Sequence, residues 1–585
     1  MLTIIFLLLP LPAAVFTQEP AGDRPAHGGL GRVTLLRNSP AEGCIAPASR
    51  AWIDAAVRRH REALGLLASR PGGGPSALAP GLYTFYPLAG TFGADIQLGG
   101  FVDLDPAPGA FHDFECGVRS YDGHAGIDTP IRSFEEQALG MPVLAARAGT
   151  VVFTRDGRPD MNLGGSTDPG NLVVLDEGGG RLAYYFHLKK DSVAVSVGQV
   201  LSAGRLLGLA ASSGNSFYPH LHFEVRDNGV VYEPFAGPCR PGPSGWLEQP
   251  QVQHSFRMLE GAATWQDLFQ AQPLPWPQPR DGDFALGDGF VYFWFIAEGL
   301  PPNGVWRHVF ERPDGTIAFD SGDLPQNNPI EWPWFNGFWY FWIPDMHSIT
   351  GTWHWRHIVN GVEHVRSPIE VVAARVPGFN RAPLPIDVEL EPAAPAPEDA
   401  ILCRVLTDAV VDDPDYDVLT YRYTWTVDGV VARAVEHAAH ADALPGGSAA
   451  AGQSVQCTVR ASDSLLEGGA ALDVLVLGGA PLELAAPEPG TAGTANTWPL
   501  DGAAAGAAVY LAYALTPGSA NVPGCPGLIA RLGSPGLADG AVADGGGHAD
   551  FIVQVPAAAA GRTLYFQAAT LASCELSNLL VYTFP

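Results

Sequence analysis

The amino-acid sequence predicts a mainly β protein made of several domains. Charged residues make up only 16% of the chain, whereas the chain contains 69 Gly and 52 Pro. This composition favours many short strands and turns over long surface helices. With 585 residues the chain is too long for one hydrophobic core, and its length predicts roughly three to five domains.

The chain opens with an apolar run, MLTIIFLLLPLPAAVFTQEP, that is followed by small residues. The run is too short to span a bilayer, and it predicts a signal peptide over residues 1–17 and hence an exported, secreted, periplasmic or cell-surface protein. No Lys or Arg precedes the run, so a buried N-terminal strand is the alternative. No later segment has the pattern of a transmembrane helix.

The net charge of −28 limits the classes of partner. Nucleic acids and anionic lipid surfaces attract local positive potential, and the sequence contains no Lys/Arg cluster. Neither class is therefore expected as the main partner.

One amphipathic helix is expected in the N-terminal segment 18–80. Trp52, Val57, Leu64 and Leu67 recur at near-helical spacing, which predicts that they form its apolar face. From residue 81 the sequence changes to strands separated by Gly turns, and this pattern runs to about residue 245.

Three further β domains are expected after residue 245, at 250–375, 376–480 and 481–585. The first is rich in aromatic residues, and its runs WRHVF at Trp306 and WRHIV at Trp355 predict two similar strands. Aromatic side chains also stack on sugars, but packing in the core of a small β domain is the more common explanation.

The cysteines suggest disulfides in an exported protein. They fall as Cys116 with Cys239, Cys403 with Cys457, and Cys525 with Cys574, which leaves Cys44 over. The order Cys403, Trp425, Cys457 predicts an Ig-like or PKD-like domain at 376–480, because a Trp packs against an inter-sheet bridge in such sandwiches. No cysteine stands in a CxxC pair, so metal binding by cysteine is not expected.

Asp413, Asp415 and Asp417 alternate as the early ligands of a calcium loop do. Thr424 stands where an EF-hand needs its final Glu, so the segment is not an EF-hand. A Ca²⁺-stiffened turn and a solvated Asp-rich turn remain as the two interpretations.

The residues that suggest chemistry lie between 121 and 226. His220 and His222 are two apart in an expected strand, so both rings project from one face while Leu221 and Phe223 point to the other. His124 and Asp128 lie four positions apart, and Gly126 permits a bend between them. Two His and one carboxylate leave an open position on a tetrahedral zinc ion, which is typical of a catalytic site. A further imidazole, His187, follows the strand RLAYYF.

These motifs together resemble the lysostaphin/LytM-type zinc metalloendopeptidase family. The chain contains, in the order that the family has them, HAGID, GMPVLAARAGTV, YFHL, VSVGQVLSAGRLLG and GNSFYPHLHFE. The resemblance covers roughly residues 115–235 and implies an antiparallel β-sheet peptidase core. It also implies roles for five residues, with the zinc ligands being His124, Asp128 and His222 and the catalytic residues being His187 and His220.

The resemblance implies a secreted zinc endopeptidase that cleaves peptide cross-links of peptidoglycan. Gly-rich secreted protein is the alternative substrate, and a non-catalytic, peptidase-like scaffold that binds wall peptides or protein is the alternative function. Two features depart from the family pattern. Eleven residues separate Asp128 from Gly140, which predicts a loop or helical turn near the cleft, and Tyr218 occupies a place often held by Gly and is expected to narrow access.

Overall fold

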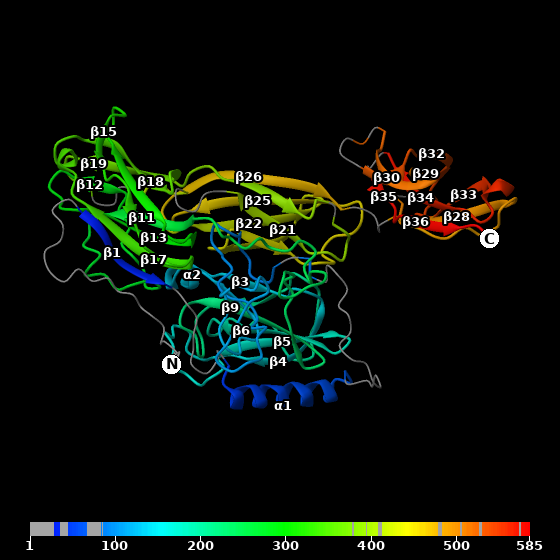
Figure 1. Ribbon diagram of the computed structural model, residues 1–585, viewed down its shortest axis with the longest axis horizontal. Helices are drawn as coiled ribbons and strands as arrows, with labels where there is room; N and C mark the ends of the chain where they lie inside the picture. Colours follow the sequence, from blue (N-terminus) through cyan, green and yellow to red (C-terminus); the bar gives the residue numbers. More distant parts are fainter. Residues whose placement is uncertain are drawn as a thin grey trace, which may run out of the picture.

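The computed structural model confirms a mainly β protein, and most of its strands pair in antiparallel sheets (Figure 1). The structure describes residues 28–35, 45–66, 83–84, 86–376, 380–393, 395–406, 412–477, 482–503, 506–523, 525, 529–571 and 575–585. The expected signal peptide at 1–17 and Cys44 lie outside this part of the chain.

A seven-stranded antiparallel sheet carries the predicted motifs. Its strands run in the order β10-β9-β6-β5-β4-β7, and β2 also pairs with β9, on the edge opposite β6. The strands are β2 (Ile127–Pro130), β4 (Gly149–Arg155), β5 (Asn171–Gly178), β6 (Arg181–Leu188), β7 (Val200–Leu201), β9 (His220–Asp227) and β10 (Val230–Tyr232). A separate ladder joins β3 (Pro142–Leu144) to β8 (Leu206–Leu209).

Helix α1 (Pro47–Ala63) lies along one face of this sheet, below β4 and β5 in Figure 1. The predicted helix is confirmed, but among the described residues of its predicted apolar face only Val57 is buried. Trp52 and Leu64 are 47% and 40% exposed, and Leu67 lies outside the described residues. Val57 is buried together with Ile53 and Ala56, and these three residues follow helical i, i+3, i+4 spacing.

The insertion after Asp128 contains a short helix, as the sequence predicts. Helix α2 (Phe134–Leu139) begins after Ser133, whose hydroxyl accepts a hydrogen bond from the backbone N–H of Glu136. This side-chain cap satisfies a backbone donor that the helix itself leaves unpaired.

The aromatic segment forms two packed sheets. One sheet has the order β1-β17-β13-β11, and the other has the order β12-β19-β18-β14-β15, with β16 on β14. Their strands are β1 (Gly28–Leu35), β11 (Arg257–Thr264), β12 (Asp283–Ala285), β13 (Val291–Leu300), β14 (Val305–Glu311), β15 (Ile317–Asp320), β16 (Leu324–Pro325), β17 (Trp332–Phe341), β18 (Gly351–Val359) and β19 (Val362–Val372), with a 3-10 turn η1 (Pro344–His347).

The aromatic residues of this segment are core residues. Trp306 and Trp355 are buried on the adjacent strands β14 and β18, which are the two similar strands that the repeated motif predicts. Strand β1 comes from the N-terminal segment and adds to the edge of the first sheet by pairing with β17. The sequence did not predict this strand.

Two sheets follow between residues 387 and 476, in the orders β20-β21-β24 and β23-β22-β25-β26. The strands are β20 (Asp387–Glu391), β21 (Ile401–Leu406), β22 (Thr420–Val427), β23 (Val430–His437), β24 (Ala441–Leu444), β25 (Ser454–Ser462) and β26 (Glu467–Val476). Cys403 lies in one sheet and Cys457 in the other, and Trp425 is buried beside Cys457.

The expected disulfides have different outcomes. Cys116 and Cys239 are bonded, as predicted. The prediction for Cys403 and Cys457 is wrong in this structure, because both are buried thiols that interact by a hydrogen bond. Cys525 is disulfide-bonded, and its predicted partner Cys574 lies outside the described residues.

The last sheets lie apart from the others along the long axis of the molecule (Figure 1). Their orders are β27-β28-β33, β32-β29-β34-β35 with β36 on β34, and β30-β31. The strands are β27 (Glu483–Leu484), β28 (Ala495–Asp501), β29 (Ala508–Ala514), β30 (Thr516–Asn521), β31 (Ile529–Gly533), β32 (Gly536–Val542), β33 (Ala549–Gln554), β34 (Thr563–Thr570), β35 (Glu575–Leu576) and β36 (Leu580–Thr583), with a 3-10 turn η2 (Ala557–Ala559).

Candidate metal centre

The pairing of β2 with β9 brings two of the predicted ligands together. Asp128 lies directly opposite His222 in this antiparallel ladder, and Pro130 lies opposite His220. Residues opposite one another in a ladder project from the same face. The side-chain distance between His222 Nδ1 and Asp128 Oδ1 is accordingly 2.9 Å.

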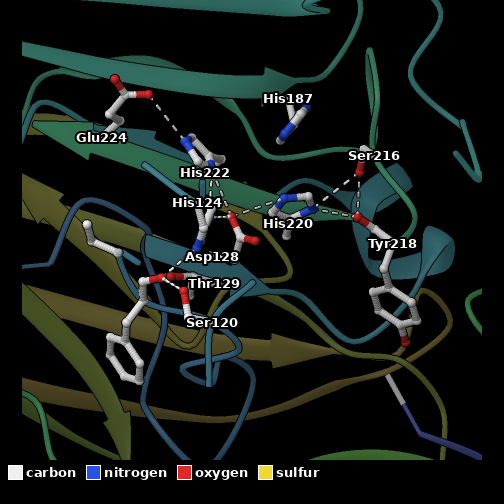
Figure 2. A network of polar contacts seen from close by, with 12 residues as sticks. Ser120, His124, Asp128, Thr129, His187, Ser216, Tyr218, His220, His222 and Glu224 are labelled. Atoms are coloured by element: carbon white, nitrogen blue, oxygen red, sulfur yellow. Dashed lines mark hydrogen bonds and ion pairs between the residues drawn. The ribbon is translucent and has the colours of Figure 1, made fainter. Parts of the chain in front are cut away.

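His124 approaches from the loop that precedes β2. Its Nδ1 lies 2.6 Å from the carbonyl oxygen of Phe101, to which it can donate, so Nε2 is turned toward the other two side chains. That nitrogen lies 3.2 Å from Asp128 Oδ1 and 3.3 Å from His222 Nδ1 (Figure 2). All three side chains are buried.

Gly126 is needed here because of a close approach between backbone and ring. Its own φ is not left-handed, but an added Cβ would come within 2.6 Å of His222 Nε2 and 2.7 Å of the carbonyl oxygen of Phe223. Any side chain at this position would therefore displace the ring of His222.

The three side chains fit a divalent metal ion. Their ligand atoms all lie within 4.8 Å of one another. The two facing ring nitrogens of His124 and His222 and the carboxylate oxygen of Asp128 are all potential electron-pair donors, and a cation relieves the repulsion among them. Two imidazoles and one carboxylate are the ligand set of an open zinc site.

The side chain of His187 lies beside these residues because its backbone departs from regular strand geometry. It has a left-handed φ of 61° near the end of β6, which breaks the alternation that would otherwise turn its side chain to the opposite face. Its ring centroid lies 4.5 Å from that of His220 and 6.0 Å from that of His222.

His187 and His220 are held in the same way. His187 Nδ1 lies 2.6 Å from the carbonyl oxygen of Ser213, and His220 Nδ1 lies 2.7 Å from that of Tyr218. The Nε2 atoms of both rings are buried without a hydrogen-bond partner in the structure, and His220 Nε2 lies 3.4 Å from Asp128 Oδ1. Two ring nitrogens are thus available beside the candidate ligands.

The site also shifts the pKa of its groups. Burial, with smaller effects of His220 and His222, holds the pKa of His187 well below its usual value. Burial raises the pKa of Asp128, but His124 and His220 outweigh it and hold that pKa well below normal. At neutral pH the site therefore contains a neutral His187 and an ionised Asp128.

Glu224 shares a face of β9 with His220 and His222, as strand alternation predicts. Its side chain is fully buried, and Oε2 lies 3.6 Å from His222 Nε2. Burial raises its pKa, but Arg50 and then His222 and Arg226 lower it below its ordinary value overall. Sequence reasoning missed Arg50, because it stands 174 positions before Glu224 and no spacing signal connects residues so far apart.

Tyr218 is held by contacts on both its hydroxyl and its ring. Its hydroxyl donates to the carbonyl oxygen of Arg132 over 2.5 Å, and its ring packs edge-on against Trp334 with centroids 4.7 Å apart. The side chain is buried. Tyr218 therefore anchors the segment before His220 to the aromatic domain.

The acidic turn at 413–417 is a second group of potential ligands. Asp413, Asp415 and Asp417 have carboxylate oxygens within 4.8 Å of one another, and burial raises the pKa of Asp413 and of Asp417 to about 6. Arg381 pairs with Asp415 over 2.7 Å and offsets part of the charge. Nothing among these contacts selects calcium, which stays a prediction.

Comparison with known proteins places the five residues inside a recognised segment. Residues 122–234 match the model of peptidase family M23. Over 87 residues, 15% of this chain, the sequence is 34% identical to the peptidoglycan DD-endopeptidase ShyA of Vibrio cholerae, and the match covers 18% of that protein. It is 29% identical over 137 residues, 23% of this chain, to an uncharacterized metalloprotease of Haemophilus influenzae, of which it covers 26%.

The chain thus spans about a quarter or less of the length of the curated relatives that it matches. Among solved structures, a zinc-containing peptidase from Vibrio cholerae is similar with 24% sequence identity and a TM-score of 0.19. That match covers 26% of this chain and 39% of the other.

Proposed function

We propose that the chain, whose residues 122–234 match the model of peptidase family M23, is a zinc-dependent endopeptidase that hydrolyses peptide cross-links of peptidoglycan. One observation carries this proposal. The candidate ligands His124, Asp128 and His222 meet in a buried group, and the Nε2 atoms of His187 and His220, which are buried without a hydrogen-bond partner, lie beside it.

In the proposed enzyme, His124, Asp128 and His222 would hold a zinc ion through the atoms that face one another, Nε2, Oδ1 and Nδ1. Such an ion would supply Lewis-acid chemistry that acidifies water and polarises a carbonyl group. The chain contributes the orientation of the ligands, because Phe101 fixes the ring of His124 through Nδ1 and Asp128 is kept ionised.

His187 is the proposed general base. Its lowered pKa leaves the ring neutral at neutral pH, and its Nδ1–H is held by the Ser213 carbonyl oxygen, so Nε2 carries the lone pair that can accept a proton from attacking water. The same nitrogen can then deliver that proton to the leaving amine. His220, with Nδ1 held by the Tyr218 carbonyl oxygen, is placed to stabilise the negative charge that develops on the scissile carbonyl oxygen.

The substrate is proposed from the relative whose name states it, a peptidoglycan DD-endopeptidase. Peptidoglycan lies outside the cytoplasmic membrane, so this substrate implies an exported protein, which agrees with the signal peptide expected at residues 1–17. Within the described residues, the helices are all too short or too polar to cross a membrane.

The test measures zinc content and hydrolysis on one purified sample, with and without a chelator. We expect near-stoichiometric zinc and chelator-sensitive loss of cross-linked muropeptides with intact glycan strands by mass spectrometry. His187→Ala should keep zinc but lose about 10²- to 10⁴-fold in turnover, whereas Asp128→Ala should lose both. Wall binding without zinc and without hydrolysis would instead identify a non-catalytic scaffold.

A further inference from the structure

The helix α1 reaches the candidate metal centre through one side chain. Arg50, in the first turn of α1, forms an ion pair with Glu224 Oε2 and is only 14% exposed at its side chain. Its guanidinium carbon also lies 5.1 Å from the ring centroid of Tyr184 and 5.3 Å from that of Phe186. Arg50 is therefore fixed by a charge and by two aromatic faces.

Glu224 connects this arginine to a candidate zinc ligand. The carboxylate is fully buried, with Arg50 and His222 Nε2 near Oε2, and it accepts from Arg226 Nε at Oε1 over 2.5 Å. Figure 2 shows Glu224 and Asp128 on different sides of the His222 ring, so the ring lies between two carboxylates.

The two nitrogens of His222 thus have different partners. Nδ1 faces Asp128 and His124, whereas Nε2 faces Glu224. Glu224 Oε2 lies 3.6 Å from Nε2, an ion-pair distance, and its negative charge favours a proton on Nε2, which leaves the lone pair of Nδ1 for a metal ion and makes that nitrogen a better ligand.

We propose that Arg50 and Glu224 are positioning residues of the metal centre, with Glu224 orienting His222 and Arg50 holding Glu224. This inference rests on the proposed zinc site. It makes α1, which lies outside the segment that matches the peptidase family, a functional part of the centre.

The packing of α1 supports this role. Ile53, Ala56 and Val57 are buried against a cluster on β4, β5 and β6 that includes Tyr184 and Phe186, and the ring of Phe186 lies edge-on to His222 with centroids 5.5 Å apart. Because β6 pairs with β9 so that Tyr184 lies opposite Glu224 and Phe186 opposite His222, α1 covers the same face of the sheet that carries the ligands.

The chain provides a matched control on the same helix. Arg61 also pairs with a buried carboxylate, Asp176, over 2.6 Å, and its side chain is 17% exposed. Asp176 lies on β5, where it pairs with Arg61 and accepts a hydrogen bond from the backbone N–H of Gly178. Arg50→Met and Arg61→Met therefore remove equivalent ion pairs, of which one adjoins the metal centre.

The experiment measures the zinc affinity of the full chain by competition with a chromophoric chelator. Arg50→Met should weaken zinc binding by about 10- to 100-fold, the range seen when partners of metal ligands are removed, and Arg50→Lys should retain part of the affinity. Arg61→Met should bind zinc as the wild type does. Thermal unfolding of the zinc-free proteins checks that both Met variants are folded.

A second readout reports the ring itself. In the zinc-free protein each carboxylate favours a proton on the ring nitrogen that it faces, Asp128 on Nδ1 and Glu224 on Nε2. Long-range ¹H–¹⁵N correlation should therefore show a larger Nε2–H population of His222 in the wild type than in Arg50→Met or Glu224→Gln. Unchanged zinc affinity and tautomer in Arg50→Met, or an equal loss of affinity in Arg61→Met, would overturn the inference. A wild-type protein that binds zinc but cleaves no muropeptide would overturn the peptidase proposal alone and leave the roles of Arg50 and Glu224 intact.

Discussion

The disulfide between Cys116 and Cys239 encloses nearly the whole candidate metal centre. The two cysteines are 123 residues apart, and they flank the segment 122–234. Cross-linking a loop of this length lowers the entropy of the unfolded chain, and the loop-closure relation gives a stabilisation of about 5 kcal/mol at 25 °C.

The folded state should change little when the bond is removed. The backbone N–H of Cys239 donates to the carbonyl oxygen of Phe114 over 2.9 Å, and Phe114 packs against Phe101 and Phe235. These contacts hold the two ends together without the bond. Cys116→Ser with Cys239→Ser should therefore act mainly on the unfolded state and lower the free energy of unfolding by up to about 5 kcal/mol.

Pulse proteolysis of the zinc-free protein in a urea series measures this loss, with fragments from β5 and β6 identified by mass. Reduction of the wild type should reproduce the effect of the double variant, and reduction of the variant should not lower the stability of this region further. A loss below about 1 kcal/mol would refute the argument from loop entropy.

Further predictions concern the packing around the site and its response to pH. Tyr218→Phe removes the donor to the Arg132 carbonyl oxygen but keeps the ring on Trp334. It should lower the local stability by about 1 kcal/mol, which hydrogen exchange at residues 130–139 measures. Unchanged protection of these amides would contradict the prediction. Ile53→Ala should destabilise the packing of α1 on the sheet by about 2–5 kcal/mol, because Ile53 is fully buried. Urea unfolding measures this loss, and an unchanged unfolding curve would show that Ile53 does not stabilise the packing of α1. Burial lowers the pKa of His357 to about 3, so the folded state binds fewer protons than the unfolded state between pH 6.5 and 3. Its stability contribution should fall on acidification through this window by up to about 1.4 kcal/mol per pH unit, and His357→Leu should flatten the slope of unfolding free energy against pH.

Most of the candidate site could be predicted because its residues occur in local motifs. Strand alternation places His220, His222 and Glu224 on one face, and the structure has them there. Spacing alone did not distinguish the proposed roles of His220 and His222, for which the family resemblance was needed. In the structure the difference comes from register, since His222 faces Asp128 whereas His220 lies opposite Pro130.

The features that escaped prediction depend on contacts between distant parts of the chain. The apolar face of α1 was misjudged because Trp52 is large and apolar but lies beside Arg155 at the surface, with the guanidinium carbon 5.5 Å from the ring centroid. The pairing of β1 with β17 joins residues about three hundred apart in sequence, and no periodicity within either segment encodes that partner.

The inter-sheet cysteines show a related limit of sequence reasoning. The order Cys403, Trp425, Cys457 correctly indicated two facing sheets with a buried Trp. Whether two neighbouring thiols become a disulfide depends on the oxidant to which the chain is exposed as well as on their placement.

The structure of the candidate site implies that the matched segment is not a self-sufficient unit. Three contacts fix it from outside residues 122–234: Arg50 of α1 holds Glu224, Phe101 holds the ring of His124, and Trp334 of the aromatic domain packs on Tyr218 two residues before His220. A metal centre needs its ligands held closely in place before the ion binds. In the proposed enzyme the surrounding parts of the chain would act on metal binding through ligand geometry, and their loss should weaken it even where every predicted ligand and catalytic histidine is retained.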